Sequence, residues 1–318
     1  MEKMTFEEFI EAARAEISER MPECKVFINK VKKNNGLLLT GISIYDQETN
    51  ISPTIYLDDI YEAIQNGNVD SVDEACDSII ALYEKNNSNV PFDVSGFADF
   101  EKAKGKICFK LINREKNASL LEEIPHEDFL DLAVEFFVFL NDVAEVPGGG
   151  YGSILIRNEH LQMWGVDLAT IKKAAMENTP KLMPNEVMGL DLAIDREMRH
   201  VRVFDIETVE KNSCCIRIYR GSDLPLYIAS NNRSLNGAGA ILYDGVLRDF
   251  ASYVDDDFYI IPLSIHETMI MPAKLVCDAD DIRNTIGIVN NTSLRDEEVL
   301  SNSLYFYSRE KDEIAIAA

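Results

Sequence analysis

Three polar side chains that could act together in hydrolysis lie within one apolar segment. Ser264, His266 and Glu267 stand in YIIPLSIHETMIMP, residues 259–272. A serine can be a nucleophile, a histidine its general base, and a carboxylate can orient the imidazole. If the segment is one continuous strand, Ser264 and His266 share a face about 6.5 to 7 Å apart at Cα, whereas Glu267 faces the other side. This strand geometry cannot form a Ser-His-Glu relay by itself. A bend after Pro262 would weaken the objection, because the three side chains would no longer alternate between two faces.

Two interpretations of this segment follow, and the sequence leaves both open. No G-x-S-x-G elbow raises Ser264 on a turn, and apolar residues occupy both faces of the alternation. The favoured interpretation is a core strand in which hydrogen bonds hold His266. The alternative is a hydrolase-type site that uses Ser264 and His266, with Glu267 or a distant acid. A concave pocket with a further polar partner would favour the alternative.

Other motifs that could bind a metal or a cofactor are incomplete. His266 and Glu267 begin the zinc motif H-E-x-x-H, but position 270 is Ile. The run PGGGYG, residues 147–152, lacks the Gly-Lys-Ser/Thr ending of a P-loop and the spacing G-x-G-x-x-G, so it predicts a linker. We therefore predict no cofactor and no metal.

The N-terminus and the cysteines indicate a cytoplasmic protein. The first residues, MEKMTFEEF, carry acids where a signal peptide needs an apolar stretch, and no run approaches the roughly 18 apolar residues of a membrane span. Six cysteines show no C-x-x-C spacing, as expected of thiols in a reducing compartment. Cys214 and Cys215 are adjacent; a structural role is favoured for them, and a redox role stays open.

Charge narrows the class of partner. Acidic side chains outnumber basic ones 55 to 31, which gives a formal charge of −24. Such a charge repels phosphate backbones and anionic lipid headgroups, so we predict no nucleic-acid partner and no membrane partner. The leading hypothesis is a soluble, acidic, non-catalytic binding or interaction protein. A protein partner is compatible with it, and the oligomeric state is not determined by the sequence.

Helices and strands alternate without a regular βαβ period, which predicts an α+β fold with mixed, largely antiparallel sheets and interleaved helices. Asn35-Gly36 predicts a tight hairpin turn, because both residues tolerate positive φ. Capping boxes, Thr5 with Glu8 and Ser71 with Glu74, mark two helix starts. The predicted helices are 5–20, 58–66, 71–85, 167–178, 238–253 and 280–290, with a helical turn at 296–301. The predicted strands are 25–32, 37–45, 51–55, 107–112, 129–140, 153–156, 201–206, 214–219, 226–229, 304–307 and 313–317. For the apolar run 129–140 a strand is favoured, and a buried helix stays open.

The glycine-rich run is the best place for a boundary between domains. It holds four glycines around Gly149, the most flexible composition in the chain. We therefore predict an N-terminal α+β portion, residues 1–146, and a C-terminal α+β portion, residues 153–318.

The chain resembles a family of bacterial proteins of uncharacterised function that is abundant in anaerobic gut bacteria. Members commonly read Pro-Ser-Ser-x-His-Glu where this chain has 262–267, so Leu263 replaces one serine, and a mechanism that needs this serine would be absent. The resemblance implies one full-length unit in the cytoplasm, and it implies no activity, cofactor or catalytic residue. It rests on the stretches 55–61, 129–134, 153–161 with Trp164-Gly165, Asn178-Thr179-Pro180, Asn231, Gly237-Ala238, 262–267 and 300–305.

Overall fold

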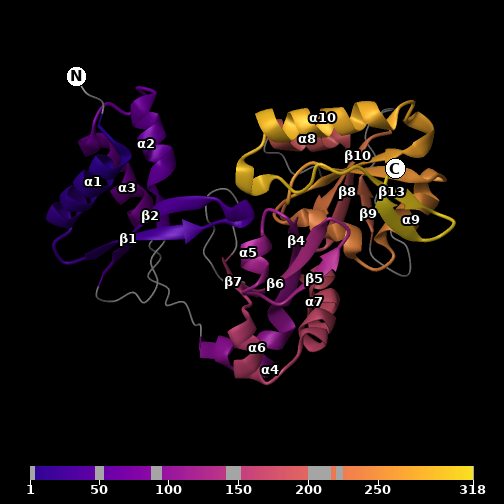
Figure 1. The fold of residues 1–318 in the computed structure, drawn as a ribbon, viewed down its shortest axis with the longest axis horizontal. Coiled ribbons are helices and arrows are strands. Elements are labelled where there is room, and N and C mark those ends of the chain that lie inside the picture. The colour runs from indigo at the N-terminus through magenta and orange to yellow at the C-terminus, as the bar shows by residue number, and fades with distance from the viewer. Residues whose placement is uncertain are drawn as a thin grey trace. The chain divides into compact units, whose positions relative to one another are not determined.

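The chain folds into two compact units. The computed structural model describes residues 4–46, 54–86, 95–140, 152–199, 216–219 and 225–317. The units are Met1–Ser95 and Gly96–Ala318, and each combines helices with an antiparallel or nearly antiparallel sheet (Figure 1). The α+β prediction is therefore confirmed.

In the first unit, three helices pack against a three-stranded antiparallel sheet. The core between them includes Phe9, Ile17, Ile42 and Ile79. Asn35 has φ 59°, as the hairpin prediction requires. The helices are α1 (Phe6–Arg20), α2 (Leu57–Gln65) and α3 (Val72–Asn86), and the strand order is β1 (Lys25–Lys32), β2 (Leu38–Tyr45), β3 (Thr54–Tyr56).

The second unit contains two sheets, of which the smaller has four strands. Its central strand β6 pairs with β4 on one side and with β5 and β7 on the other. Leu130 has φ 55° and turns the chain from β5 into β6. The strands are β4 (Ile107–Asn113), β5 (His126–Phe129), β6 (Leu132–Leu140) and β7 (Gly152–Leu155), and the nearby helices are α4 (Phe100–Ala103), α5 (Ala118–Leu121), α6 (Asn158–Trp164) and α7 (Leu168–Leu182).

The larger sheet of the second unit has seven strands and helices on both faces. Helices α8 (Leu190–Arg199) and α10 (Ala279–Thr292) lie along the same side of it (Figure 1). On the other face, Phe250 of α9 (Val246–Val254) stacks edge-on against Phe258. The strand order is β14 (Glu313–Ile316), β13 (Tyr305–Ser308), β11 (Phe258–Pro262), β12 (Thr268–Pro272), β10 (Tyr227–Asn231), β8 (Asn185–Gly189) and β9 (Arg217–Tyr219). Only the pair β8–β9 is parallel among these described strands.

The two sheets of the second unit share one apolar core, and a carboxylate links them at its edge. Phe136 of β6 and Ile260 of β11 belong to the same buried cluster. The Asp131 carboxylate, next to the β5–β6 turn, accepts hydrogen bonds from three hydroxyls: those of Ser301 at 2.5 Å, Ser303 at 3.0 Å and Tyr305 at 2.7 Å. Tyr305 is the first residue of β13, and Ser301 and Ser303 lie in the segment that leads into it, so the bonds connect the smaller sheet to the larger one.

The predicted domain junction differs from the division that the structure shows. Gly149 lies outside the described residues, but the strands on either side of it belong to one sheet, with Leu140 opposite Gly152. Backbone pairing across the glycine run holds both sides in one unit, and the compact units divide after Ser95 instead. Whether cleavage at the run separates two portions stays a prediction.

One further prediction is wrong in part, and another is not tested by the described residues. The predicted helix 238–253 is broken: a 3-10 helix spans Gly237–Leu242, and α9 begins only after Gly245, whose φ of 78° is not helical. The predicted strand 201–206 lies outside the described residues. Among the residues that are described, no helix is both long enough and apolar enough to cross a membrane.

Candidate functional site

The segment with Ser264, His266 and Glu267 is a hairpin and not one strand. Strand β11 ends at Pro262 and β12 begins at Thr268, directly opposite it in the register. The intervening turn is closed by two short-range hydrogen bonds: the Ser264 N–H donates to the Glu267 carbonyl at 3.1 Å, and the His266 N–H donates to Ser264 Oγ at 3.0 Å. A serine side chain that accepts from the backbone two residues on competes with strand pairing, which explains why the strand prediction is wrong for residues 263–267.

Backbone groups from two other segments hold the turn in place. The Ile265 carbonyl accepts from the Ala238 N–H at 3.2 Å, and the Ile265 N–H donates to the Glu298 carbonyl at 2.9 Å. The turn is thus fixed both to the 3-10 helix after β10 and to the segment after α10. These segments lie far apart in the sequence.

Gly237 allows a very close approach of β10 to the turn. Ser230 Oγ donates to the His266 carbonyl at 2.8 Å, directly beside Gly237. A Cβ atom at position 237 would overlap Ser230 Oγ, and it would lie 2.6 Å from the His266 carbonyl oxygen and 2.7 Å from the Asn231 nitrogen. Two of these atoms belong to the backbone and cannot move aside cheaply, so the packing here requires glycine.

The His266 imidazole is held in one neutral tautomer. Its Nδ1 accepts a hydrogen bond from the Asn236 N–H at 3.1 Å, so the ring proton is on Nε2. Nε2 faces the Glu298 carboxylate, 3.9 Å from Oε1. Burial lowers the pKa of His266 from its usual value, although the carboxylate of Glu298 acts in the opposite direction. The ring is therefore uncharged at neutral pH.

The turn brings Ser264, His266 and Glu267 together without assembling a relay. Ser264 is only 6% exposed, and its oxygen accepts from the backbone of His266. A general base needs a free imidazole lone pair, but that of His266 Nδ1 is occupied by the Asn236 N–H, and Nε2 carries the proton. In this arrangement the imidazole does not take a proton from Ser264.

The three residues nevertheless line a concave pocket of about 310 Å³. Two more carboxylates face it from distant segments: Glu186 on β8, and Glu298 in the turn after α10. Side-chain hydroxyls and an amide add further polar groups, from Ser230, Asn231 and Ser234, and the apolar part of the wall consists of Met188, Ala193, Ile228 and Leu294. No motif in the sequence indicates Glu186 or Glu298, because only the fold brings them beside residues 264–267.

Three carboxylates contribute to the wall of the pocket. Glu186, Glu267 and Glu298 line it together with the neutral ring of His266. Arg295 lies 3.9 Å from Glu298 Oε1, but its side chain is 72% exposed and directed mainly into solvent. Within the described ranges, no three His, Cys, Asp or Glu side chains are arranged to hold a metal ion. The carboxylates that line this pocket therefore do not converge on one metal ion.

The cysteines supply no further site in the described part of the chain. Cys24, Cys76, Cys108 and Cys277 are free thiols. Burial raises the pKa of Cys108 to about 12, which keeps this thiol protonated and unreactive. Cys214 and Cys215 lie outside the described residues.

Comparison with known proteins gives a family and no named relative. The model of a family of unknown function, DUF5688, matches residues 6–309. No curated protein and no solved structure matches the chain. Three stretches that carried the resemblance, Asn231, Gly237-Ala238 and 262–267, meet at the pocket described above.

Proposed function

Because the chain belongs to this family of unknown function, its role has to be inferred from its own residues, and we propose that it is a non-catalytic binding protein. Its binding site is the pocket at the β11–β12 turn. The observation that carries this proposal is the chemistry of the pocket wall: three carboxylates surround a histidine whose lone pair is already used. Such a wall can recognise a ligand but has no prepared nucleophile–base pair.

The ligand that fits this wall is an organic cation. Carboxylates bind ammonium and guanidinium groups through charge-assisted hydrogen bonds, which are stronger than neutral ones. A cavity of about 310 Å³ is at the small end of ligand pockets and suits a single cationic group with a short stem. The group can come from a free small molecule or from a lysine or arginine side chain of a partner protein.

Isothermal titration calorimetry with arginine amide and with its uncharged analogue citrulline amide tests the proposal. We expect arginine amide to bind and citrulline amide to bind at least about 10-fold more weakly, because one charge-assisted bond contributes about 1.5–3 kcal/mol. Glu298→Gln should weaken the binding of arginine amide by a similar factor. Glu297→Gln is the matched control, since Glu297 is adjacent in sequence but does not line the pocket.

The same titration distinguishes the two sources of the cation. If the tripeptide Gly-Arg-Gly binds more tightly than arginine amide, the pocket recognises a basic side chain within a polypeptide. If the free amide binds as tightly or more tightly, the ligand is a small molecule. Equal binding of arginine amide and citrulline amide, or no effect of Glu298→Gln, would refute an electrostatic site.

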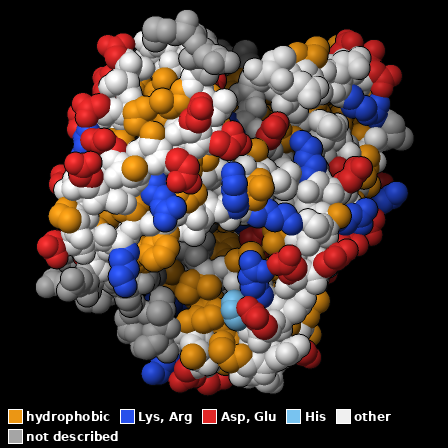
Figure 2. Space-filling model, turned by 60° about the vertical axis from the view of Figure 1, so that its left-hand side comes forward, with side chains coloured by type: hydrophobic (Ala, Val, Ile, Leu, Met, Phe, Trp, Pro, Cys, Tyr) orange, Lys and Arg blue, Asp and Glu red, His pale blue; other side chains and the backbone are white. Residues whose placement is uncertain are grey.

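The proposal includes a soluble protein in the cytoplasm that does not bind nucleic acid. On the face seen in Figure 2, Lys and Arg side chains are interspersed with Asp and Glu and form no continuous basic surface. Together with the formal charge of −24, this supports the absence of a phosphate-binding surface. A fluorescence-anisotropy titration with DNA and RNA at physiological salt should show no binding at micromolar protein concentrations.

A further inference from the structure

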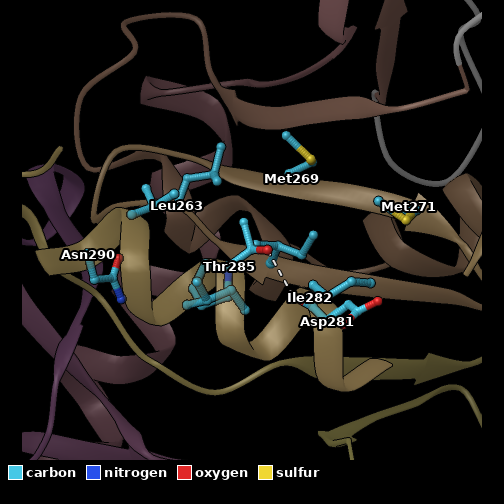
Figure 3. A pocket seen from close by; sticks show the side chains of 11 residues that line it. Leu263, Met269, Met271, Asp281, Ile282, Thr285 and Asn290 are labelled. Atoms are coloured by element: carbon cyan, nitrogen blue, oxygen red, sulfur yellow. Dashed lines mark hydrogen bonds between the residues drawn. The ribbon is translucent and has the colours of Figure 1, made fainter. Parts of the chain in front are cut away.

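A second cavity, of about 380 Å³, lies between helix α10 and the hairpin β11–β12 (Figure 3). Its wall is almost entirely apolar. The hairpin contributes Ile261, Pro262, Met269 and Met271 from its strands and Leu263 from its turn, and the helix contributes Asp281, Ile282, Thr285, Ile286, Val289 and Asn290.

Strand alternation and helix periodicity explain why this wall is apolar. Ile261 and Met269 are cross-strand partners, so both project from the same face of the sheet. Ile282, Ile286 and Val289 follow the i, i+4, i+7 spacing of one helix face. Several of these side chains remain partly exposed and would lose water on binding an apolar ligand.

Two details of the wall bear on the kind of ligand that it can accept. Met269 and Met271 have flexible, polarizable side chains, which adjust to ligands of different shape. The Thr285 hydroxyl donates to the Asp281 carbonyl of its own helix at 2.8 Å, so it is not available as a donor to a ligand (Figure 3).

Asn290 places a polar side chain in the wall of the cavity. It is 7% exposed, and its Nδ2 donates to the Ser301 carbonyl at 2.9 Å and to Asn302 Oδ1 at 2.7 Å. Among the described residues no hydrogen bond reaches Asn290 Oδ1, and in Figure 3 this oxygen lies on the side of Leu263. Asn290 lines the cavity, and its oxygen is not one of the buried, unsatisfied side-chain atoms of the described residues, so it can be reached from the cavity and can accept a hydrogen bond from a ligand or from water.

The rim of the cavity disfavours an anionic ligand. Asp281 lines the cavity and is exposed, at the first turn of α10, and Asp278 and Asp280 lie beside it. Arg283 forms an ion pair with Asp280, which leaves the carboxylate of Asp281 facing the opening without a basic partner in the part of the chain that is described. A carboxylate or phosphate headgroup would meet this negative charge.

We propose that this cavity is a binding site for a neutral, apolar small molecule that carries one hydroxyl or N–H donor. The apolar body lies between α10 and the hairpin, and the donor reaches Asn290 Oδ1. The volume of the cavity matches the lower range of ligand pockets. This site does not depend on the organic cation proposed for the polar pocket.

Three probes with the same chain length separate the parts of this proposal. We expect 1-octanol to bind, its methyl ether to bind about 10-fold more weakly because it lacks the donor, and octanoate to bind at least about 10-fold more weakly because of its charge. Ligand-observed NMR titration gives the three affinities. Asp281→Asn should reduce the discrimination against octanoate and leave the affinity for 1-octanol unchanged.

A filled cavity provides the decisive variant. Val289→Phe places a ring into the cavity and should abolish binding of 1-octanol, whereas Ile288→Phe, on the outer face of the same helix and 63% exposed, should not. Glu298→Gln should also leave this binding unchanged, so failure here and failure of the polar site are distinguishable. If Val289→Phe does not fold, Thr285→Phe is the second filling variant. Equal affinity of 1-octanol and its ether, or full binding by a folded filling variant, would overturn the proposal.

Discussion

Asp131 is the residue whose removal should destabilise the second unit most clearly. Its carboxylate accepts three hydroxyl donors, from Ser301, Ser303 and Tyr305, and Ser301 and Tyr305 are fully buried. Burial raises the pKa of Tyr305, so its phenol stays protonated and donates throughout the accessible pH range. Asp131→Ala removes all three bonds and leaves buried hydroxyls without an acceptor.

The magnitude follows from these contacts. A hydrogen bond to a charged group contributes about 1.5–3 kcal/mol, and bonds that share one acceptor are not additive. We therefore expect Asp131→Ala to lower the free energy of unfolding by about 3–5 kcal/mol. For a unit of this size, each kcal/mol corresponds to about 2–4 °C, so the melting temperature should fall by about 6–20 °C.

Urea unfolding followed by circular dichroism measures this change. Asp128→Ala is the matched control, because Asp128 lies three residues away and its side chain is 59% exposed. Its ion-pair partners among the described residues are Arg114 and, at a longer distance, His126. Loss of an exposed ion pair should cost less than about 1 kcal/mol. If Asp131→Ala unfolds within about 1 kcal/mol of the parent protein, the carboxylate does not stabilise the contact between the sheets.

The remaining predictions concern the turn of the polar pocket. A fluorophosphonate probe should not label Ser264, since its oxygen is buried and no base is available; specific labelling would support the hydrolase alternative. Ser264→Ala should lower the free energy of unfolding by about 1–2 kcal/mol, because the His266 N–H loses its acceptor. The pKa of His266 is lowered in the folded protein, so this residue contributes to the free energy of unfolding above about pH 6.5, and the contribution is lost as the pH falls below that value. In urea unfolding, His266→Gln should therefore lose less stability than the parent protein between about pH 7 and pH 5. Gly237→Ala should lower the free energy of unfolding by about 2 kcal/mol or more, because its Cβ would overlap Ser230 Oγ. Gly287→Ala in α10 is the control: its Cβ meets no atom within 4 Å, so it should raise the free energy of unfolding by about 0.5–1 kcal/mol, and similar melting temperatures for the two variants would contradict this packing argument.

Local signals in the sequence predicted the fold well where short-range contacts decide it. Thr5 and Glu8 form the predicted capping box, and Asn35 adopts the positive φ of the predicted hairpin turn. The sequence did not predict helix α6, because the helix is short and its N-cap residue, Arg157, has no side-chain acceptor for the first N–H groups. The His160 imidazole instead accepts a hydrogen bond from the Arg157 N–H at 3.0 Å. Helix α7 continues through Pro180 to Leu182, whereas the sequence predicted an end at residue 178. Pro180 has no N–H to donate, but the bonding resumes after it, since the Met183 N–H donates to the Thr179 carbonyl at 2.8 Å.

The site was less predictable, because its parts are joined by long-range pairing. The sequence singled out His266, but the carboxylates of Glu186 and Glu298, which line the same pocket, come from β8 and from the turn after α10. Nothing in the spacing of these residues indicates that the order of strands in the larger sheet brings them together. The Nδ1 lone pair of His266 decides whether this residue can act as a base, and it accepts a hydrogen bond from the backbone N–H of Asn236. A motif of side chains cannot predict such a backbone contact.

The β11–β12 turn connects the two cavities mechanically. Leu263 lines the apolar cavity, and the next residue, Ser264, lines the polar pocket, so consecutive residues of one short turn form part of both walls. Any displacement of this turn changes both cavities at once. If ligands at the two sites favour different positions of the turn, each will alter the affinity of the other by the same factor, as thermodynamic linkage requires. The β11–β12 turn would then transmit ligand binding in one cavity to the affinity of the other, and both cavities lie on the same face of the larger sheet.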